Sequence, residues 1–499
     1  MTLRAADLRF ALSVPVRSAT VLGGDDGPGA EHVRQVAAGL RAAGVELSSV
    51  AVGLGAATRV DLVVAPARRA GEALTVPAAT HLLLGRPPAG VRRDAGGHAR
   101  PLLVRGDAAR PLFVVPAEQP ATVRHYLSRM SAPPSRFGRV RNRAMAAALR
   151  APVPTGRLLP ARSLVTVITT AAAESRLPLL VRAAERLGLP GDVGWVLALG
   201  SGDDLQRAVF HLLDAGRPRW VLKFARVPGY DAPFRRDEAG LTLAHSAGPV
   251  VAAHAPVLLG RFHLAGIAAS VETAAPGRPL IELIGRRSWS GLAAGLVDAV
   301  AGWVVAVGAA TAAPAASLVP ERLRLEHDVL ACWQRAGAPA DLVRNLPDVP
   351  GVLQHNDLGS WNIVTDGSGF TAVDWESARP LGLPLWDLLY LLGDCLVRLD
   401  GPASLPTLMT RTLALFRGES PRSPALFAWV RRAVTALRIP PRAVGPVATL
   451  CWLHHGLSAD ARGAALAGAP PAASGHLARL AAPWLADPAL GPGWSAWSV

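Results

Sequence analysis

The sequence has almost no lysine. Its 499 residues include 52 basic side chains, and Lys223 is the only lysine among them. Against 37 acidic residues, these give a formal net charge of +15. Because arginine replaces lysine along the whole chain, we interpret the charge as a compositional bias. It does not indicate a nucleic-acid-binding surface, and we predict no nucleic-acid partner.

Cysteine is also scarce. Cys332, Cys395 and Cys451 lie far apart and form no CxxC pair. This excludes a disulfide framework and a cysteine-based zinc site as the organising feature, and it suits a reducing compartment. The first residues lack the pattern of a signal peptide, since a short apolar run over 10–16 is followed by Arg17. We therefore predict a cytoplasmic protein.

Charge is missing from one long segment, 299–318, which is rich in alanine and glycine and contains Pro314. A membrane-spanning helix and a buried core helix that ends near the proline are both compatible with this composition. Small residues and a proline make a weak membrane span. We therefore favour the buried helix and predict no stable membrane insertion.

Apolar runs alternate with helical patterns in the first part of the chain. The runs predicted as strands are 18–23, 45–52, 61–65, 81–84 and 112–115. Alternation of strands and helices favours a small parallel α/β domain of Rossmann-like type over residues 1–131. The turn at 23–29 does not fit GxGxxG, and its two aspartates would repel a pyrophosphate. We interpret this domain as structural or recognition-related.

A segment rich in proline and arginine follows at 132–176. Its arginines include Arg136, Arg139, Arg141, Arg143 and Arg150. Such a cluster could bind an acidic partner or membrane phosphates, or it could be a solvated helix with a linker. We interpret the segment as a basic linker.

The polar residues with the clearest chemical meaning lie between short apolar runs at 352–374. His355 and Asp357 follow one run, Asn362 precedes the next, and Asp374 follows a third. Two carboxylates and an amide oxygen are hard ligands of the kind that Mg²⁺ takes beside substrate phosphates. A carboxylate that is not bound to metal could accept a proton from an attacking hydroxyl.

This order of residues resembles the aminoglycoside phosphotransferase and choline kinase family of kinase-like enzymes. The resemblance implies that Asp357 is the catalytic base and that Asn362 and Asp374 bind Mg²⁺. It further implies that His355 and Asp387 support the loop structurally. Asn356 stands where the family usually has glycine, and asparagine also accepts unusual backbone angles.

A small β-rich lobe is predicted upstream. Strands are expected at 195–199, 208–213 and 220–224, with a turn at Gly200, Ser201 and Gly202 that would cover phosphates. In kinase-like folds, a lysine on the third strand holds the nucleotide phosphates, and Lys223 occupies that strand. A guanidinium is a wide fork that does not fit the slot of an ammonium, so lysine survives here in an arginine-rich chain.

Two glutamates complete the predicted nucleotide site. Glu238 begins a helical pattern and is the expected partner of Lys223, with Asp237 as its neighbouring alternative. Glu272 lies in a strand-like run before a predicted hinge, where the backbone would meet an adenine edge.

These observations predict an α+β, bilobal, protein-kinase-like fold behind the α/β domain. The small lobe spans 177–275 and the mostly helical lobe 276–499, and the resemblance itself covers 177–457. The predicted reaction moves the γ-phosphoryl group of ATP or GTP to a hydroxyl of a small molecule such as a sugar, an amino alcohol or an aminoglycoside-like acceptor. The alternative is a non-catalytic nucleotide-binding module in a biosynthetic assembly.

Overall fold

The computed structural model divides the chain into two compact units. One comprises Met1–Phe234 and Val257–Ala274, and the other comprises Arg235–Pro256 and Ala275–Val499. The structure describes residues 3–498 except 14–15, 23–29, 49–58, 87, 89, 92–97, 108–109, 132, 134, 152–158, 160–163, 170–176, 201–206, 287–288, 468–472 and 474. The glycine-rich turn at 23–29 lies outside the described residues.

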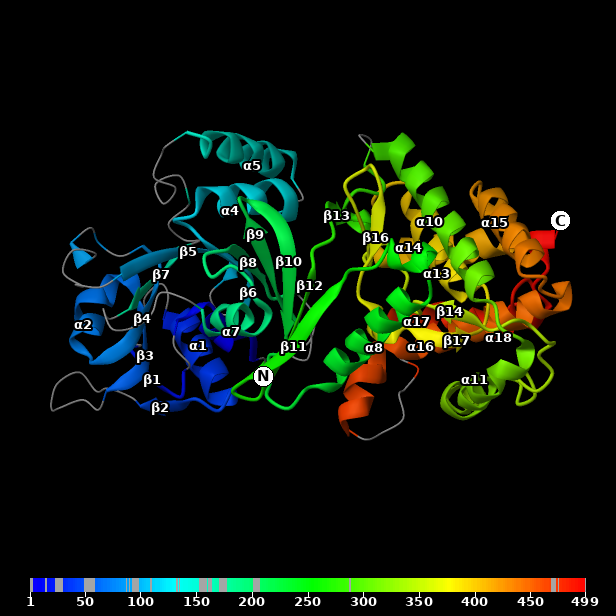
Figure 1. The fold of residues 1–499 in the computed structure, drawn as a ribbon, viewed down its shortest axis with the longest axis horizontal. Helices are drawn as coiled ribbons and strands as arrows, with labels where there is room; N and C mark the ends of the chain where they lie inside the picture. Colours follow the sequence, from blue (N-terminus) through cyan, green and yellow to red (C-terminus); the bar gives the residue numbers. More distant parts are fainter. Residues whose placement is uncertain are drawn as a thin grey trace. The chain divides into compact units, whose positions relative to one another are not determined.

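The first unit is built on a twelve-stranded sheet in the order β11-β12-β10-β9-β8-β6-β5-β7-β4-β3-β1-β2 (Figure 1). The strands are β1 (Ser18–Val21), β2 (Glu46–Ser48), β3 (Val60–Pro66), β4 (Ala78–Leu84), β5 (His98–Asp107), β6 (Arg110–Pro116), β7 (Leu164–Thr169), β8 (Gly194–Ala198), β9 (Ala208–Asp214), β10 (Arg217–Phe224), β11 (Leu258–Leu264) and β12 (Ile267–Thr273). Its helices include α1 (Ala30–Ala42), α2 (Ala70–Thr75), α4 (Pro120–His125), α5 (Arg136–Ala148) and α7 (Pro178–Leu187), with η1 (Leu3–Ala11) and η3 (Tyr126–Met130).

Strand direction changes within this sheet. β2, β1, β3 and β4 are parallel, with α1 between β1 and β2 and α2 between β3 and β4. From β7 to β11, every pairing is antiparallel. The parallel part has the strand–helix alternation expected from the sequence, and its Rossmann-like assignment stays a prediction.

The sheet and its core run across the predicted domain limits. Leu8, Leu62, Val167, Phe210 and Phe224 belong to one cluster of buried side chains. β7 lies inside the segment that we interpreted as a linker, and all six of its residues are buried between β4 and β5. The pattern Leu-Val-Thr-Val-Ile-Thr is that of a central strand, which the proline- and arginine-rich surroundings obscured. The predicted limits at 131 and 176 are therefore not breaks in the sheet.

The start of the chain packs beside β10. The η1 residue Arg9 donates to the carbonyl oxygen of Arg226 at 2.8 Å, and Asp7 lies 3.5 Å from the Arg226 guanidinium. Phe10 meets Phe224 edge to face, with ring centroids 4.7 Å apart. The strand that carries Lys223 is thus packed against the N-terminal residues.

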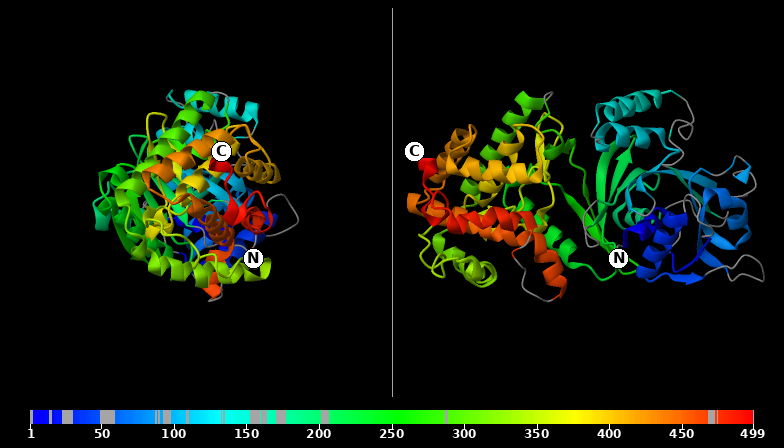
Figure 2. Two further views of the ribbon diagram at one scale, coloured as in Figure 1. Left: turned by 90° about the vertical axis from the view of Figure 1, so that its right-hand side faces the viewer. Right: turned by 180° about the vertical axis from the view of Figure 1, so that it is seen from behind.

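The second unit is mainly helical, with small sheets among its helices (Figures 1 and 2). Its helices include α8 (Ala232–Ser246, which begins in the first unit), α9 (Pro249–Ala252), α10 (Ser290–Thr311), α11 (Val319–Arg324), α12 (Ala331–Trp333), α13 (Trp386–Arg398), α14 (Leu405–Arg417), α15 (Ser423–Ala436), α16 (Pro441–Ala467), α17 (Gly475–Ala481) and α18 (Pro483–Ala486). One sheet has the order β13-β15-β16 (Arg278–Pro279, Ile363–Thr365, Phe370–Ala372), and the other pairs β14 (Val352–Gln354) with β17 (Arg379–Gly382).

The uncharged segment noted in the sequence falls largely on α10. Of the described helices, only this one is long and apolar enough to cross a membrane, by length and composition alone. Half of its most apolar window is buried within the protein. Trp303 on this helix donates its indole N–H to the carbonyl oxygen of Val250 at 2.7 Å, and Gly308 lies against Leu437. α10 packs as a core helix of the second unit.

Candidate active site

The loop that follows β14 is held in place through hydrogen bonds from its backbone N–H groups to Asp387. Asp387, at the start of α13, accepts the N–H of His355 at 2.7 Å and the N–H of Asn356 at 2.8 Å. Asn356 has φ 64°, in the left-handed region that asparagine tolerates better than most side chains do. The departure from glycine at this position is thus compatible with the loop geometry.

Asp357 and Asn362 meet at the two ends of the same loop. The amide nitrogen of Asn362 donates to the backbone oxygen of Asp357 at 2.8 Å and to its Oδ2 at 3.1 Å. The backbone oxygen of Asn362, which directly precedes β15, accepts the N–H of Val373 at 2.8 Å, and Asp374 is the residue after Val373. Asp374, two residues after the end of β16, has φ 67° and ψ 63°, which is left-handed backbone geometry.

The electrostatics of Asp357 reflect this arrangement. Burial is the largest cause of a change in its ionisation, and the negative charge of Asp374 is the next. Together they raise the pKa of Asp357 to about 7, although hydrogen bonds from Trp361 and Asn362 act in the opposite direction. A carboxyl with this pKa can hold or release a proton near neutral pH.

His355 contacts the residues on either side of Asp374. Its Nε2 lies 3.0 Å from the backbone oxygen of Val373, and its ring packs on Trp375 with centroids 4.7 Å apart. Trp375 donates its indole N–H to the backbone oxygen of Ala372 at 2.9 Å. The loop and the Asp374 turn are therefore tied to each other by buried contacts.

One face of α13 supports both halves of the loop. Asp387, Tyr390 and Asp394 follow an i, i+3, i+7 pattern, so they lie on the same side of the helix. Asp394 accepts the N–H of Ser360 at 3.0 Å, and the Tyr390 ring meets Trp361 edge to face at 5.8 Å. Asp394 was not among the predicted residues, and its seven-residue spacing from Asp387 is the sequence signal that could have revealed it.

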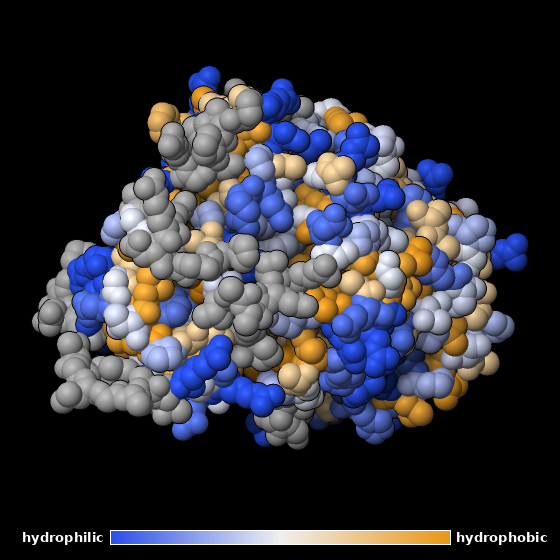
Figure 3. All heavy atoms as spheres, turned by 60° about the vertical axis from the view of Figure 1, so that its left-hand side comes forward, coloured by the Kyte–Doolittle hydropathy of each residue, from blue (hydrophilic) through white to orange (hydrophobic). Residues whose placement is uncertain are grey.

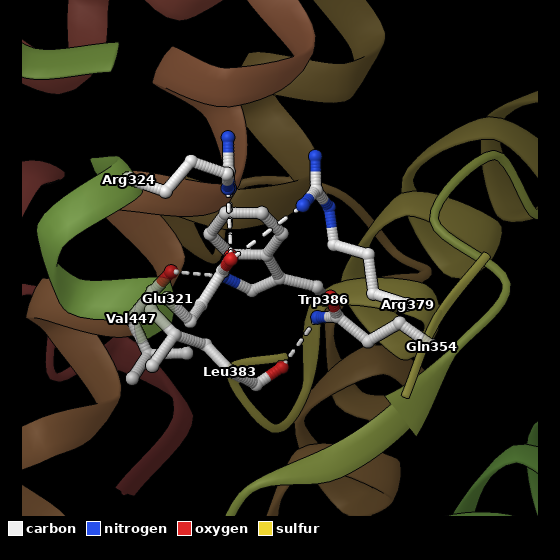
Figure 4. A network of polar contacts seen from close by, with 7 residues as sticks. All are labelled: Glu321, Arg324, Gln354, Arg379, Leu383, Trp386 and Val447. Atoms are coloured by element: carbon white, nitrogen blue, oxygen red, sulfur yellow. Dashed lines mark hydrogen bonds and ion pairs between the residues drawn. The ribbon is translucent and has the colours of Figure 1, made fainter. Parts of the chain in front are cut away.

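The strands beneath the loop are fixed by a second set of polar contacts, shown in Figure 4. Glu321 on α11 accepts two bonds from Arg324, at 2.6 and 2.8 Å, and lies 3.7 Å from Arg379 on β17. Arg379 pairs with Gln354 of β14, whose side chain donates to the backbone oxygen of Leu383 at 2.6 Å.

α13 is anchored in the same region. Figure 4 also shows the indole of Trp386, which donates to the backbone oxygen of Val447 at 3.0 Å. Because Trp386 precedes Asp387, this bond positions the helix end that binds the loop of His355 and Asn356. The Arg–Glu–Arg group and Trp386 were not predicted as parts of the site, since Arg379 lies far from Glu321 in the sequence and Val447 lies far from Trp386.

In the first unit, Lys223 forms a buried ion pair with Glu272. Lys223 Nζ lies 2.9 Å from Glu272 Oε2, and the two side chains are 9% and 5% exposed. The register explains the contact: Val221 lies opposite Glu272 and Lys223 opposite Ser270, so Lys223 and Glu272 are diagonal neighbours on one face of the sheet. Leu222 and Phe224 point to the other face and into the core.

The remaining predicted nucleotide residues are placed separately. Gly200 lies two residues after the end of β8 and has φ 66°, in the left-handed region that glycine adopts readily. Ser201 and Gly202 lie outside the described residues. Glu238 lies on α8 in the second unit, so its pairing with Lys223 stays a prediction.

Comparison with known proteins places this site in a family. Residues 198–427, just under half of the chain, match the family model "Phosphotransferase enzyme family". This segment is similar to that family. The predicted resemblance is confirmed for it, as are a mixed α+β kinase-like fold and an enzyme that acts as a small-molecule kinase.

Solved structures of phosphotransferases show distant similarity. An aminoglycoside-3'-phosphotransferase of type VIII is 20% identical, with a TM-score of 0.30, over 51% of this chain and 99% of its own. The enzyme APH(3'')-Id from Streptomyces rimosus is 17% identical, with a TM-score of 0.31, over 52% and 90%. A glucosamine kinase is 14% identical, with a TM-score of 0.32, over 59% and 91%. No curated protein matches the chain in sequence.

The donor set of this phosphotransferase fits a magnesium ion that is shared with substrate. Since the amide nitrogen of Asn362 is bonded to Asp357, a metal at this position would be bound by the amide oxygen. Asp374 supplies a carboxylate. The described residues hold no group of three or more His, Cys, Asp or Glu that could bind a metal. Two protein ligands suit Mg²⁺ when phosphate oxygens and water complete its shell.

Proposed function

We propose that this phosphotransferase moves the γ-phosphoryl group of a nucleoside triphosphate, ATP or GTP, to a hydroxyl of a small molecule. The observation that carries the proposal is the enclosed carboxylate of Asp357, bonded to Asn362 and raised in pKa to about 7 by burial and by Asp374. A base of this kind can orient an acceptor hydroxyl and take its proton as the new P–O bond forms.

The other residues are assigned roles around that base. Asn362 and Asp374 would hold Mg²⁺, which neutralises phosphate charge when it is bound. Asp387 and His355 keep the loop in place. The ion pair with Glu272 supports the assignment of Lys223 to the nucleotide phosphates, because it fixes the ammonium in a buried position. Gly200, Ser201, Gly202 and Glu238 complete the proposed nucleotide site.

The acceptor belongs to the class of hydroxyl-bearing small molecules, with sugars and amino alcohols as the first compounds to test. No described contact favours the alternative of a non-catalytic nucleotide-binding module. Turnover of nucleotide that depends on an acceptor distinguishes the two functions.

The decisive experiment compares Asp357→Asn with Asp366→Asn. Asp357→Asn removes the base, keeps the size of the side chain, and should lower acceptor-dependent phosphoryl transfer by at least about a hundredfold while nucleotide still binds. Asp366 is an exposed turn residue of the same unit and accepts bonds from Ser368 that asparagine can also accept, so it serves as the control. Phosphorylated product is measured by mass spectrometry over a panel of sugars and amino alcohols. Undiminished turnover in Asp357→Asn would refute the assignment.

A further inference from the structure

An exposed helix of the first unit combines arginine with apolar side chains on its outer side. On the face drawn in Figure 3, hydrophobic residues occur in small groups between hydrophilic ones. α5 (Arg136–Ala148) differs, because its exposed apolar residues and its exposed arginines lie in separate rows along the helix. Phe137 is 77% exposed and Val140 is 54% exposed, and these are the two most exposed large apolar side chains of the first unit in the described part of the chain.

The helix is fixed by its opposite side. Gly138, Asn142 and Ala146 are buried there, and Asn142 donates to Ser131 Oγ at 2.9 Å. Ser135 caps the N-terminus by accepting the N–H of Gly138 at 3.0 Å. The helix that carries the exposed side chains is therefore anchored to the first unit, and Figure 1 shows it at the edge of that unit.

The exposed apolar residues form a continuous stripe. Phe137, Val140, Ala144 and Ala147 follow an i, i+3, i+7, i+10 pattern, and all are exposed. At the helical repeat, Arg141 lies on one side of this stripe.

Arginines continue on the other side of the stripe. Arg136 and Arg143 flank it there, with Arg139 and Arg150 farther round the helix. All of these arginines are exposed, and residues 136–150 contain no Asp or Glu.

We propose that α5 binds the surface of an anionic phospholipid bilayer, with the Phe137 stripe in the interface and the flanking arginines on lipid phosphates. A basic helix with an outward apolar stripe is the arrangement that lies in a membrane interface. Arginine side chains on both flanks can reach the headgroups while their stems cover the apolar edge. A nucleic-acid backbone would satisfy the arginines and leave the aliphatic stripe in water, so the lipid surface fits better. This attachment is independent of the proposed phosphoryl transfer.

The test uses the full chain in vesicle flotation, with phosphatidylcholine alone and with added phosphatidylserine. The wild-type protein is expected to float with the anionic vesicles and to be released by high salt, because salt screens the arginines. Phe137→Ser with Val140→Ser, and separately Arg141→Glu with Arg143→Glu, should each weaken binding by about tenfold or more.

Matched controls come from the second unit. Val319→Ser with Leu323→Ser changes residues that are 55% and 51% exposed on α11, and Arg335→Glu with Arg344→Glu changes exposed arginines elsewhere. Both controls should bind vesicles as the wild-type protein does. Phosphotransferase activity on soluble acceptors should be unchanged in the α5 variants, which separates this proposal from the proposed function.

Three results would overturn the proposal. They are a wild-type protein that does not bind anionic vesicles, α5 variants that bind as well as the controls, and binding to oligonucleotides that depends on the arginines without any binding to vesicles. The last result would identify α5 as a nucleic-acid-binding helix instead.

Discussion

The ionised carboxylate of Asp357 lowers the stability of the folded protein. Burial and the charge of Asp374 raise its pKa to about 7, so the folded protein holds this proton more tightly than the unfolded chain does. Between the unfolded and folded pKa values, the native state therefore binds more protons, and stability falls as pH rises through that interval. Above about pH 7 the full cost is present.

Asp357→Asn should accordingly be more stable than the wild-type protein at pH 8. With 1.36 kcal/mol for each pKa unit and a reduction for partial solvent access, the expected gain is roughly 2 kcal/mol. The gain should shrink toward zero as pH falls below about 3, where the carboxyl is protonated in both the folded and the unfolded state of the wild-type protein. Thermal unfolding in the presence of EDTA, with Asp366→Asn as control, measures it. An equal or lower Tm for Asp357→Asn at pH 8 would contradict the electrostatic account.

At the scale of elements, strand register determines which residues meet in the first unit. Lys223 and Glu272 are brought together because β10 and β12 are antiparallel neighbours in a register that puts them diagonally across one face. The sequence indicated Lys223 from its rarity and its strand, but it assigned Glu238 as the partner. Pairing across β12 depends on which strands become neighbours, and no local pattern encodes that.

Glu272→Gln should therefore impair nucleotide binding more than Glu238→Gln does. Removal of one partner leaves the Lys223 ammonium buried without its 2.9 Å carboxylate, which is costly and lets the side chain move. We expect the KM for ATP to rise by about tenfold or more, with a smaller effect on kcat. Steady-state kinetics on both variants, with Tm as a check of folding, provide the comparison. A larger rise in KM for Glu238→Gln would instead favour the partner assigned from the sequence.

The helix α13 shows how much of the site the sequence could predict. Asp387 was recognised as a loop support by its place after the Asp374 motif, whereas Asp394 and Tyr390 were missed although they share its helical face. The motif residues lie close together in the sequence, and the spacing between them can be recognised without a structure. Supporting residues such as Asp394 bind backbone N–H groups. Any residue except proline has such a group, so the sequence of the bound loop does not reveal which residue supports it.

The same distinction holds for the elements themselves. The strands of the meander at β8, β9 and β10, and the apolar helix α10, were predicted at nearly their observed places because their apolar patterns are local. β7 was missed because a stretch rich in proline and arginine, 150–163, directly precedes it. Its burial comes from β4 and β5, which lie far from it in the sequence.

At the scale of the whole molecule, one compact unit, Met1–Phe234 with Val257–Ala274, joins the N-terminal residues to the strands of the predicted small lobe. β6 pairs with β8 through Val114 and Leu197, and Leu199 donates its N–H to Leu112 at 2.9 Å. The hydrophobic core contains side chains from Leu8 to Val271. Arg226, two residues beyond the strand of Lys223, is covered by Asp7 and Arg9.

A fragment of residues 177–499, which contains the whole predicted kinase region, should consequently fail to fold as a stable enzyme. The fragment lacks β6, so the edge of β8 would be exposed. It also lacks Leu62, Val104 and Val167, whose loss would expose the core face of the remaining strands. We expect aggregation, or a loss of the cooperative unfolding transition, and no phosphoryl transfer. The full chain is the reference, and circular dichroism, gel filtration and nucleotide turnover are the measurements. A monomeric fragment with a sharp transition and full activity would show that the small lobe is stable alone, and that the shared sheet is an attachment of a separate domain.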